Sequence, residues 1–385
     1  MVRNVKIEGI KMRKISVLFF LFLAVLAALS CKEKEKNNEK TKNPSALFPV
    51  VQNGKVGYID KTGRIIIKPQ FDGASDFSEG LARIFVEQKQ GYIDETGKVV
   101  IKPQFDAASD FSEGLALVVV DGKRGYIDKT GELVVKPQFD NTWGFSEGLA
   151  SVNIGGKYGY VDKTGKLVIK PQFDVASNFS EGLALVVVNG KRGYIDKTGK
   201  VVIEPQFDGA SDFSEGLASV NMGGKHGYID KTGKIVIKQQ FNVASNFSEV
   251  LALIVIKGKR GYIDKTGKIV IKPQFSSASN FSKGLARVVV NGKVGYIDRT
   301  GKMAIKPQFD GASDFSEGLA LVGINGKVGY IDRTGKIVIK PRFDGASNFS
   351  KGLAIVYINH KQGYIDKSGN YVWNPTGYSL PHKHP

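Results

Sequence analysis

Short runs of apolar residues alternate with polar turns along most of the chain, and the same pattern keeps returning. One copy, residues 193–225, reads GYIDKTGKVVIEPQFDGASDFSEGLASVNMGGK. A fixed period of this kind predicts a repeat architecture in which each unit packs on its neighbours. The Gly-Tyr opening recurs at a constant spacing, at Gly57, Gly91, Gly125, Gly159, Gly193, Gly227, Gly261, Gly295, Gly329 and Gly363.

The composition of each copy predicts strands and excludes helices, although the helical tetratricopeptide unit, of about 34 residues, has the same length. With few exceptions, each copy has Gly at its first, seventh, twenty-fourth and thirty-second places and Pro at its thirteenth. In a helix interior Gly costs about 1 kcal/mol and Pro about 3 kcal/mol. The runs between them are β-branched, as in residues 65–67 and 118–120, which favours strands.

The limits of the repeated pattern indicate units of three strands. The pattern starts at Leu47, late in a repeat, and ends at Pro375, in the middle of one, which gives ten units. Between the first and second strands stands a pair such as Asn189-Gly190, a favoured two-residue hairpin connection. Between the second and third strands, residues 60–63 read Asp-Lys-Thr-Gly, which suits a type I turn with a glycine bulge. Pro69 and its counterparts predict that the third strand is an edge strand or is ending there.

The linker between two units is unusually aromatic. Each full repeat carries two linker phenylalanines, such as Phe71 and Phe77, and these supply 18 of the 23 Phe in the chain. Burial of one such ring stabilises a fold by about 1.5–3 kcal/mol. The linker rings are therefore expected to pack between neighbouring units, because a short meander is marginally stable alone.

The expected fold is all-β, with ten tandem three-stranded antiparallel meanders of 34-residue period stacked in an open superhelical, solenoid- or propeller-like array. Propellers usually have about four to eight blades, each with four strands and about 40 residues. Ten units of this shorter length fit an open superhelix better on this count. A propeller-like arrangement stays open, with the aromatic linker as a fourth element of each unit.

The consensus GK-x-GYID-x-TGK-x-VI-x-PQFD-x-A-x-x-FSEGLA resembles the WG-containing (KWG) repeat of bacterial proteins over residues 47 to 375. The resemblance implies a repeat scaffold without a known catalytic centre, and it implies no particular partner. The family's namesake Trp is absent, so no role of that Trp is carried over. Its place before the Gly is taken by Val56, Gln90, Arg124, Tyr158, Arg192, His226, Arg260, Val294, Val328 and Gln362.

The N-terminal residues resemble a bacterial export signal. Basic residues up to Lys14 precede an apolar run over residues 17–29, which is too short for a comfortable membrane span. Cys31, the only cysteine, follows as in a lipoprotein signal, where it is diacylated, although Ala28 stands where such signals usually have Leu. We expect a signal peptide over 1–30, lipidated Cys31 with a disordered tether over 31–46, the repeats over 47–375 and a disordered tail over 376–385. A plain signal without lipidation and a start at Met12 remain alternatives.

The chain is basic, with a formal net charge of +18. Residues 1–30 hold five basic residues and one acidic residue and so contribute +4, which leaves +14 on the mature chain. Repetition would align lysines into a stripe that attracts acidic glycans, lipopolysaccharide or anionic head groups, but not nucleic acid. The alternative is an ordinary solvated face, since each repeat also carries Asp and Glu. The candidate lysines precede the Gly-Tyr strand and are Lys123, Lys191, Lys225 and Lys293.

Few residues break the repeat, and they are the places to look for chemistry. Trp143 replaces a Ser in the third copy and is the best candidate for a partner contact; alternatively, it fills the gap left by a missing Ala. Gln239, Asn242 and Val250 break the sixth copy. The histidines show no metal-ligand spacing, and the Asp-Lys-Thr-Gly turns have too few ligands for calcium. We therefore expect no catalytic residue, no cofactor and no metal.

Together these features predict a non-catalytic cell-envelope lipoprotein whose repeats form a scaffold for binding proteins or glycans. Its partners would be the membrane, through the lipid anchor, and envelope proteins or acidic glycans, at the outer membrane, the periplasmic face or the cell surface. Two alternatives remain: an envelope enzyme acting on glycan through the third and sixth copies, or a purely structural bridge from membrane to wall. The sequence does not indicate an oligomeric state.

Overall fold

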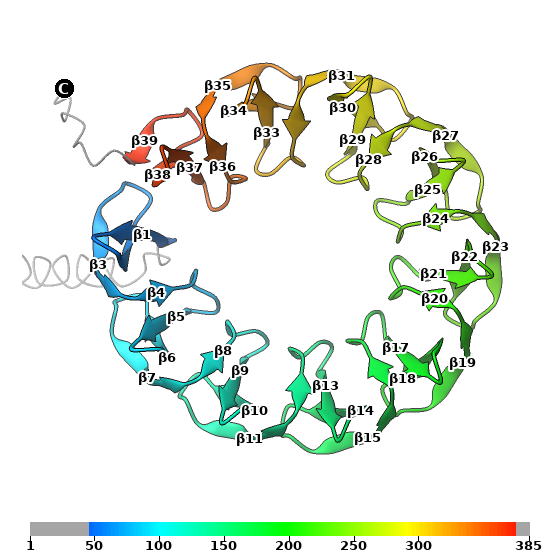
Figure 1. Ribbon diagram of the computed structural model, residues 1–385, viewed down its shortest axis with the longest axis horizontal. Coiled ribbons are helices and arrows are strands. Elements are labelled where there is room, and N and C mark those ends of the chain that lie inside the picture. Colours follow the sequence, from blue (N-terminus) through cyan, green and yellow to red (C-terminus); the bar gives the residue numbers. More distant parts are fainter. Residues whose placement is uncertain (1–45, 375–385) are drawn as a thin grey trace, which may run out of the picture. The chain divides into compact units, whose positions relative to one another are not determined.

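The computed structural model describes residues 46–374, which form ten small antiparallel sheets and, within that range, no helix. The chain divides into two compact units between Ala46 and Leu47, and all the sheets belong to the second unit. Within that unit the sheets stand as blades around a ring, in sequence order (Figure 1). Blade 1 is β1–β3, blade 2 is β4–β7, and each later blade takes the next four strands up to blade 10, β36–β39. The repeat region is a ten-bladed β-propeller.

The innermost strand of blades 2–10 has two residues, and the second strand is longer. The innermost strands are β4 (Gly73–Ala74), β8 (Ala107–Ala108), β12 (Asn141–Thr142), β16 (Val175–Ala176), β20 (Gly209–Ala210), β24 (Val243–Ala244), β28 (Ser277–Ala278), β32 (Gly311–Ala312) and β36 (Gly345–Ala346). The second strands are β1 (Phe48–Gln52), β5 (Leu81–Val86), β9 (Leu115–Val120), β13 (Leu149–Ile154), β17 (Leu183–Val188), β21 (Leu217–Met222), β25 (Ala252–Ile256), β29 (Leu285–Val290), β33 (Leu319–Ile324) and β37 (Ala354–Ile358).

Counting blade 1 as beginning at its second position, the third strand of each blade carries the Gly-Tyr motif, and the fourth lies on the outside of the ring (Figure 1). The third strands are β2 (Lys55–Ile59), β6 (Lys89–Asp94), β10 (Lys123–Asp128), β14 (Lys157–Asp162), β18 (Lys191–Asp196), β22 (Lys225–Asp230), β26 (Lys259–Ile263), β30 (Lys293–Asp298), β34 (Lys327–Asp332) and β38 (Lys361–Ile365). The outer strands are β3 (Ile65–Phe71), β7 (Val99–Phe105), β11 (Leu133–Phe139), β15 (Leu167–Phe173), β19 (Val201–Phe207), β23 (Ile235–Phe241), β27 (Ile269–Phe275), β31 (Met303–Phe309), β35 (Ile337–Phe343) and β39 (Tyr371–Trp373).

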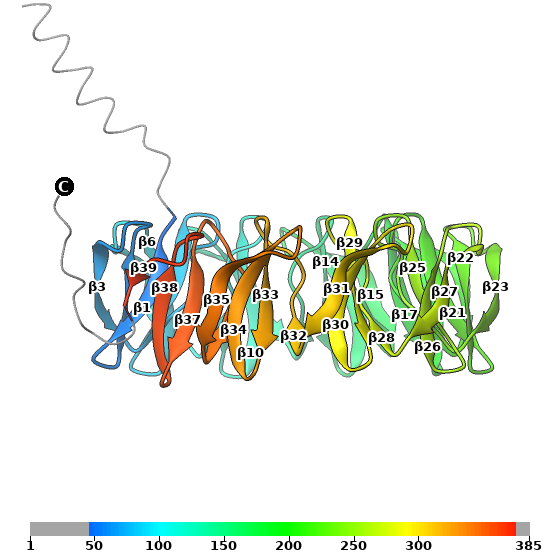
Figure 2. The same cartoon turned by 90° about the horizontal axis from the view of Figure 1, so that it is seen from above.

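Both predicted turns are present, and they put the loops on two opposite faces of the ring (Figure 2). Asn189 and Gly190 have φ of 50° and 75°, as their two-residue hairpin requires. In the other turn Asp196 Oδ1 accepts hydrogen bonds from the backbone and hydroxyl of Thr198, and the Thr198 hydroxyl lowers the pKa of Asp196. We call the face with the Asn189-type hairpins the hairpin face and the face with the Asp196-type turns the turn face.

The outer strand bulges over the glycine of the Gly-Tyr motif. In blade 5, Arg192 pairs with Phe207 and Tyr194 pairs with Ile203, so two residues of β18 oppose four of β19. The extra length brings the backbone around Pro205 across Gly193, where an added Cβ would lie 2.5 Å from Ile203 O and 2.6 Å from Pro205 N. The first glycine of the repeat is thus required by close backbone approach.

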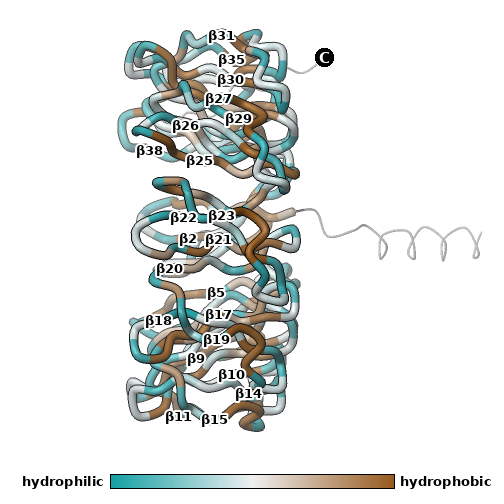
Figure 3. The backbone as a smooth tube through the Cα atoms, turned by 90° about the vertical axis from the view of Figure 1, so that its right-hand side faces the viewer, coloured by the Kyte–Doolittle hydropathy of each residue, from teal (hydrophilic) through white to brown (hydrophobic). Residues whose placement is uncertain are grey.

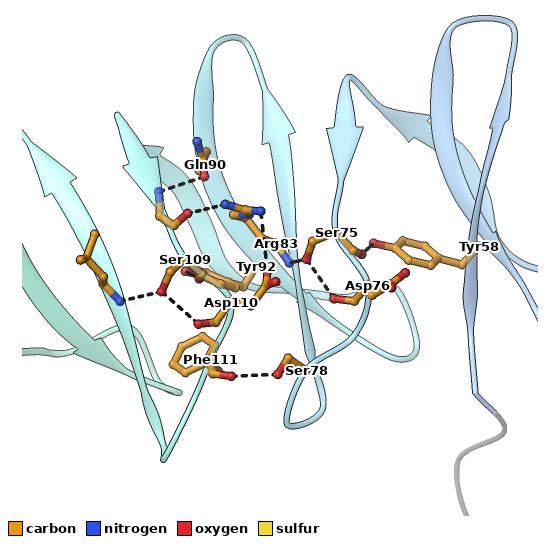
Figure 4. Close-up of polar contacts among 12 residues, drawn as sticks. Tyr58, Ser75, Asp76, Ser78, Arg83, Gln90, Tyr92, Ser109, Asp110 and Phe111 are labelled. Atoms are coloured by element: carbon orange, nitrogen blue, oxygen red, sulfur yellow. Dashed lines mark hydrogen bonds and ion pairs between the residues drawn. The ribbon is translucent and has the colours of Figure 1, made fainter. Parts of the chain in front are cut away.

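The core lies between blades, where the linker aromatics pack as predicted. Tyr194 of blade 5 meets Phe213 of blade 6 with ring centroids 4.9 Å apart. The Tyr194 hydroxyl donates to Ser211 O at 2.7 Å, and Figure 4 shows the same contacts made by Tyr58 and Tyr92. Each of the nine core clusters joins neighbouring blades and lies within residues 47–371. The repeat region therefore contains its whole core and folds as a unit.

The ring closes where blade 10 meets blade 1, at a seam built from different residues. Within residues 46–374 blade 1 has three strands and no innermost strand, and the matching linker positions in the sequence hold no Phe. Phe48 stands where the next copy has the buried Ala82, and its ring meets Tyr364 of blade 10 at 5.7 Å, edge to face. The Tyr364 hydroxyl donates to Pro49 O at 2.7 Å, in place of the usual serine carbonyl. A larger side chain at one repeat position thus replaces the missing linker ring.

The all-β array of ten units is confirmed, and the structure decides between the arrangements that the sequence left open. The sequence favoured an open superhelix, but the blades close into a propeller because the linker contributes a short innermost strand and Phe48 completes the last junction. The predicted signal peptide, Cys31, the tether and the C-terminal tail lie outside the described residues. Within residues 46–374 no helix is long and apolar enough to cross a membrane.

Candidate functional site

A ring of ion pairs runs around the hairpin face. In seven blades the Lys at the start of the third strand meets the Asp that follows the outer strand, at 2.5–2.6 Å. Asp208 is an example: Lys191 lowers the pKa of its carboxyl, which also accepts the Gly223 backbone N–H. The pairs are Lys55–Asp72, Lys89–Asp106, Lys123–Asp140, Lys157–Asp174, Lys191–Asp208, Lys293–Asp310 and Lys327–Asp344. These half-exposed pairs neutralise most of the face.

The four lysines predicted to form a basic stripe therefore differ in their surroundings. Lys123, Lys191 and Lys293 are each paired with an Asp. Lys225 is not, because the Asp of the repeat is replaced by Asn242. No ion pair joins Lys225 to another residue within 46–374.

One further break of the same kind occurs in the next blade and was missed from the sequence. Ser276 replaces the Asp that would pair with Lys259, so Lys259 also has no ion pair in the described part of the chain. Lys257 occupies the hairpin between β25 and β26, and its backbone N–H lies 3.4 Å from Asn242 Oδ1. Lys225, Lys257 and Lys259 form the blade 6–7 basic patch. The signal in the sequence was the loss of Asp at one repeat position in two consecutive copies.

A polar pocket is lined by His226, the residue that follows Lys225 in the chain. It has a volume of about 230 Å³, and its lining includes Arg192, Ser211, Ser219 and His226. Ser219 Oγ is 3.3 Å from His226 Nδ1 and 3.4 Å from Ala244 O. In blade 2 the position of Ser219 holds Arg83, whose guanidinium bridges to the next blade (Figure 4). The shorter Ser219 keeps only a long contact to the equivalent acceptor, Ala244 O at 3.4 Å, and leaves the space of the guanidinium open beside the imidazole of His226.

These groups can bind an anionic or hydroxyl-rich ligand. The Arg192 guanidinium is always charged and donates one hydrogen bond to Asp208 O, which leaves other donors. Burial lowers the pKa of His226, so the imidazole is neutral at pH 7. The Ser211 hydroxyl donates to Asp212 O at 3.2 Å and accepts the Ser219 backbone N–H at 3.1 Å, so its second lone pair is what it can offer a ligand. The pocket and the blade 6–7 basic patch together supply positive charge beside oriented polar groups.

The lowered pKa of His226 predicts a pH dependence of stability. As the pH falls below about 6.5, the ordinary histidine value, the unfolded chain takes up a proton at His226 that the folded protein does not. The free energy of unfolding should therefore fall with pH from about 6.5 towards the folded pKa. Urea unfolding on both sides of pH 6.5 should show a smaller loss in His226→Gln than in the unchanged protein. Equal losses in the two proteins would contradict the burial of this imidazole.

Trp143 lies in blade 4, just after β12, away from the patch in blades 6 and 7. Its side chain is 55% exposed. The place of the missing Ala is taken instead by Thr142, which is buried and donates to Ser151 O at 2.8 Å. Trp143 therefore does not fill the gap, and it offers an isolated aromatic contact on the inner part of the ring.

No metal centre or catalytic carboxylate cluster accompanies these groups in the part of the chain that the structure describes. Nowhere in residues 46–374 do three His, Cys, Asp or Glu side chains gather so that they could hold a metal ion. Of the other breaks in the sixth copy, Gln239 contacts Met222 Sδ at 3.8 Å, and Val250 adopts φ 66° on the turn face. Neither changes the charge beside Lys225.

The likeness to solved structures is distant. One described as the eukaryotic initiation factor is 12% identical, with a TM-score of 0.50, over 85% of this chain and 95% of that chain. BamB from Moraxella catarrhalis is 14% identical, with a TM-score of 0.34, over 84% of this chain and 92% of its own. At such identities a likeness shows the fold alone. No curated protein matches the chain.

The family model described as WG containing repeat matches nine consecutive segments of the chain. The segments are residues 57–89, 91–123, 125–158, 158–191, 193–225, 227–259, 261–293, 295–327 and 329–361. They follow the period of the Gly-Tyr motif and cover most of blades 1–10, including the candidate site. The chain belongs to the WG-containing repeat family.

Proposed function

We propose that the protein is a non-catalytic binding scaffold of the cell envelope, anchored to the membrane through lipidated Cys31, and that it binds acidic glycans at the blade 6–7 basic patch. One observation carries the proposal. Lys225 and Lys259 lack the Asp that neutralises the same Lys in seven other blades at 2.5–2.6 Å. Within residues 46–374 Lys361 of blade 10 is also in no ion pair, but only in blades 6 and 7 are two neighbouring lysines of this largely neutralised face unpaired, which attracts anions to that place.

The adjoining pocket favours a glycan over a simple anion. Acidic sugars carry one carboxylate or sulfate among many hydroxyls, and the pocket offers Arg192 beside the imidazole of His226 and the hydroxyl oxygen of Ser211. The lysines of the patch lie on the hairpin face, and a longer polymer can extend along this face. Acidic polymers of this kind occur in bacterial envelopes, where the N-terminal sequence predicts that the protein resides.

The Ser219–His226 pair supports binding better than hydrolysis. A hydrolytic serine needs a base that a third group orients, usually a carboxylate. No carboxylate in residues 46–374 hydrogen-bonds to His226, and Ser219 is almost fully buried. The enzyme alternative for the sixth copy therefore has a nucleophile and a base, but no orienting group and little access for substrate.

The proposal is tested by restoring the missing acids. In the double variant Asn242→Asp, Ser276→Asp, each new carboxylate should pair with its Lys as Asp208 does with Lys191 at 2.5 Å. Because two exposed cations are then neutralised, the affinity for an oligomer of galacturonic acid should fall about tenfold at low salt. Isothermal titration would measure it, with a neutral galactose oligomer as the ligand control.

A matched control makes the opposite change elsewhere on the same face. Asp310→Asn frees Lys293 in blade 8 but leaves the blade 6–7 basic patch and its pocket unchanged. Its affinity for the galacturonic acid oligomer should stay within about twofold, since the pocket beside Lys293 has Arg287 and Val294 in place of Ser219 and His226. Unchanged affinity in the double variant, or equal responses of the two variants, would rule out the patch as the binding site.

A further inference from the structure

The net charge of the repeat region sits on the outside of the ring. Two positions of each outer strand, the residue before it and its fourth residue, are basic in most blades and exposed, as Lys98 and Lys102 are in blade 2. Over blades 1–9 these positions hold sixteen Lys or Arg and two Glu, a net +14. Residues 46–374 as a whole hold 44 Lys or Arg and 33 Asp or Glu, a net +11. The rest of the repeat region is thus close to neutral.

We call the outer strands together the outer rim. Nearly all of the sixteen cations at these two positions of the outer rim are in no ion pair within the described residues. Of the sixteen, only Arg64 forms an ion pair with another residue of the described region, and its partner is Asp60 in the adjacent turn. Seven lysines of the hairpin face pair with Asp, and most lysines of the turns pair with Glu, as Lys197 does with Glu147. Outside the blade 6–7 basic patch, most of the unpaired positive charge of residues 46–374 therefore lies on the outer strands.

Exposed aliphatic residues lie between these two positions of the outer strands. The first two residues of the strand are exposed, as Ile235 and Val236 are in blade 6, and Figure 3 shows a hydrophobic stretch at β23 where this part of the rim faces the viewer. Sixteen of the 24 exposed large hydrophobic residues stand at these two positions, each between 36% and 47% exposed. They are Ile65, Ile66, Val99, Val100, Leu133, Leu167, Val168, Val201, Val202, Ile235, Val236, Ile269, Val270, Met303, Ile337 and Val338.

Protection of the sheet edge against pairing with other chains explains the cations of the outer strands but not their exposed aliphatic pairs. Lys and Pro on an edge strand discourage pairing with other chains, which accounts for residues such as Lys68 and Pro69. Exposed Ile and Val pairs on the same strands have the opposite effect, because apolar patches promote association. A rim that keeps both in blade after blade fits a partner that is both anionic and apolar.

We propose that the outer rim lies on an anionic lipid bilayer, with the aliphatic pairs in the interface and the flanking cations on the head groups. The pairs directly follow the turns, so they line the border between the rim and the turn face. Basic side chains around aliphatic ones are the arrangement by which proteins bind the surface of anionic membranes. A second copy of the ring is a poorer occupant, since two rims of net +14 repel each other.

Vesicle binding tests the proposal directly. The fragment of residues 46–385, which retains the whole core and lacks the signal and Cys31, would be sedimented with vesicles of phosphatidylcholine alone or mixed with phosphatidylglycerol. Binding is expected to the mixed vesicles only and to weaken as salt is raised. Replacing the aliphatic pairs of three blades with serine (Ile235→Ser, Val236→Ser, Ile269→Ser, Val270→Ser, Ile337→Ser, Val338→Ser) should lower the partition coefficient about tenfold or more.

Matched controls separate the rim from other causes. Val175→Ser with Val243→Ser changes two valines that are 49% exposed on the innermost strands, and vesicle binding should be unaffected. Thermal unfolding of every variant shows whether it is folded. The restored-acid variant of the glycan site should bind vesicles normally, so the two proposals fail separately.

Three results would overturn the lipid proposal. The first is unchanged vesicle binding by the folded rim-serine variant, which would mean that charge alone acts. The second is binding to polyglutamate, which has no apolar part, as tight as binding to the mixed vesicles. The third is a dimer of the fragment in sedimentation velocity that the rim-serine changes dissociate, which would assign the rim to a second copy.

Discussion

Phe48→Ala is expected to open the ring at the seam between blades 10 and 1. The ring of Phe48 is 7% exposed and meets Tyr364 at 5.7 Å. Truncating a buried Phe to Ala costs about 3–5 kcal/mol, because the transfer free energy is lost and a cavity remains. The loss falls at blade 1, which has only three strands within the described residues and no linker Phe to compensate. Denaturant unfolding should report a free energy of unfolding lower by about that amount.

Hydrogen exchange locates the effect, and an equivalent substitution inside the ring controls for it. Phe48→Ala should speed exchange in β2 and β38, while blades 5–7 stay protected. Phe247→Ala removes a buried ring that lies 4.9 Å from Tyr228 and should cost a similar free energy. Its faster exchange should appear in blades 6 and 7 instead. Equal protection of β2 and β38 in Phe48→Ala and the unchanged protein would show that other contacts hold the seam.

Gly193→Ala should destabilise the protein by about 3 kcal/mol, at the upper end of the usual cost of overpacking. The new Cβ would lie 2.5 Å from Ile203 O and 2.6 Å from Pro205 N. Both are backbone atoms of a bulge that is tied to β18, so neither can move aside without breaking the pairing of β18 with β19. The shift in the midpoint of urea unfolding measures the cost.

Substitutions at two other glycines distinguish the cost of steric crowding from the cost of a positive φ. Gly144→Ala adds a Cβ with no heavy atom within 4 Å and no positive φ, so its effect should stay within about 0.5 kcal/mol. Gly190→Ala meets open space but sits at φ 75°, which costs about 1–2 kcal/mol. If Gly193→Ala cost no more than Gly190→Ala, the close approach of the bulge would not be what requires the glycine.

The blade itself could be predicted from the sequence because its causes are local. Asn189-Gly190 dictates its hairpin through two positive φ angles, and Asp196 dictates its turn through hydrogen bonds to the backbone of Thr198 and Lys200. Both signals lie within a short stretch of the chain. The sequence also predicted the buried linker rings, since large apolar side chains that recur in every linker are expected to be buried.

The reason for the repeated glycine before each Tyr was not predictable in the same way. The bulge that requires it is a feature of strand pairing, in which two residues of β18 oppose four of β19. In blade 6 the Pro of the bulge is replaced by Gln239, yet an added Cβ on Gly227 would still lie 2.7 Å from Gln239 N. The tertiary pairing, and not the proline, sets the requirement for glycine.

The candidate site was only partly visible in the sequence. Lys225 was among four candidate lysines, but which of them are neutralised depends on an Asp beyond the outer strand that meets the Lys across a blade junction, as Asp208 meets Lys191. Arg192 and His226 belong to consecutive copies of the repeat and line one pocket only because their blades are neighbours. The net charge of the sequence includes the cations of the outer rim, but the sequence pattern predicted the basic stripe at the hairpin-face lysines instead.

By itself, the sequence determined the ten units, their strands and turns, and the rings that join them, because each follows from contacts within a unit or between a unit and the next. The tertiary structure alone decided that the array closes, since closure depends on the small rotation between blades summed over the whole ring. It also decided which cations are left free, since pairing depends on side chains that meet only after the blades have packed. The repeat specifies the same contacts at nine junctions between blades. The junction between blades 10 and 1 is built from different residues, and only the structure shows it.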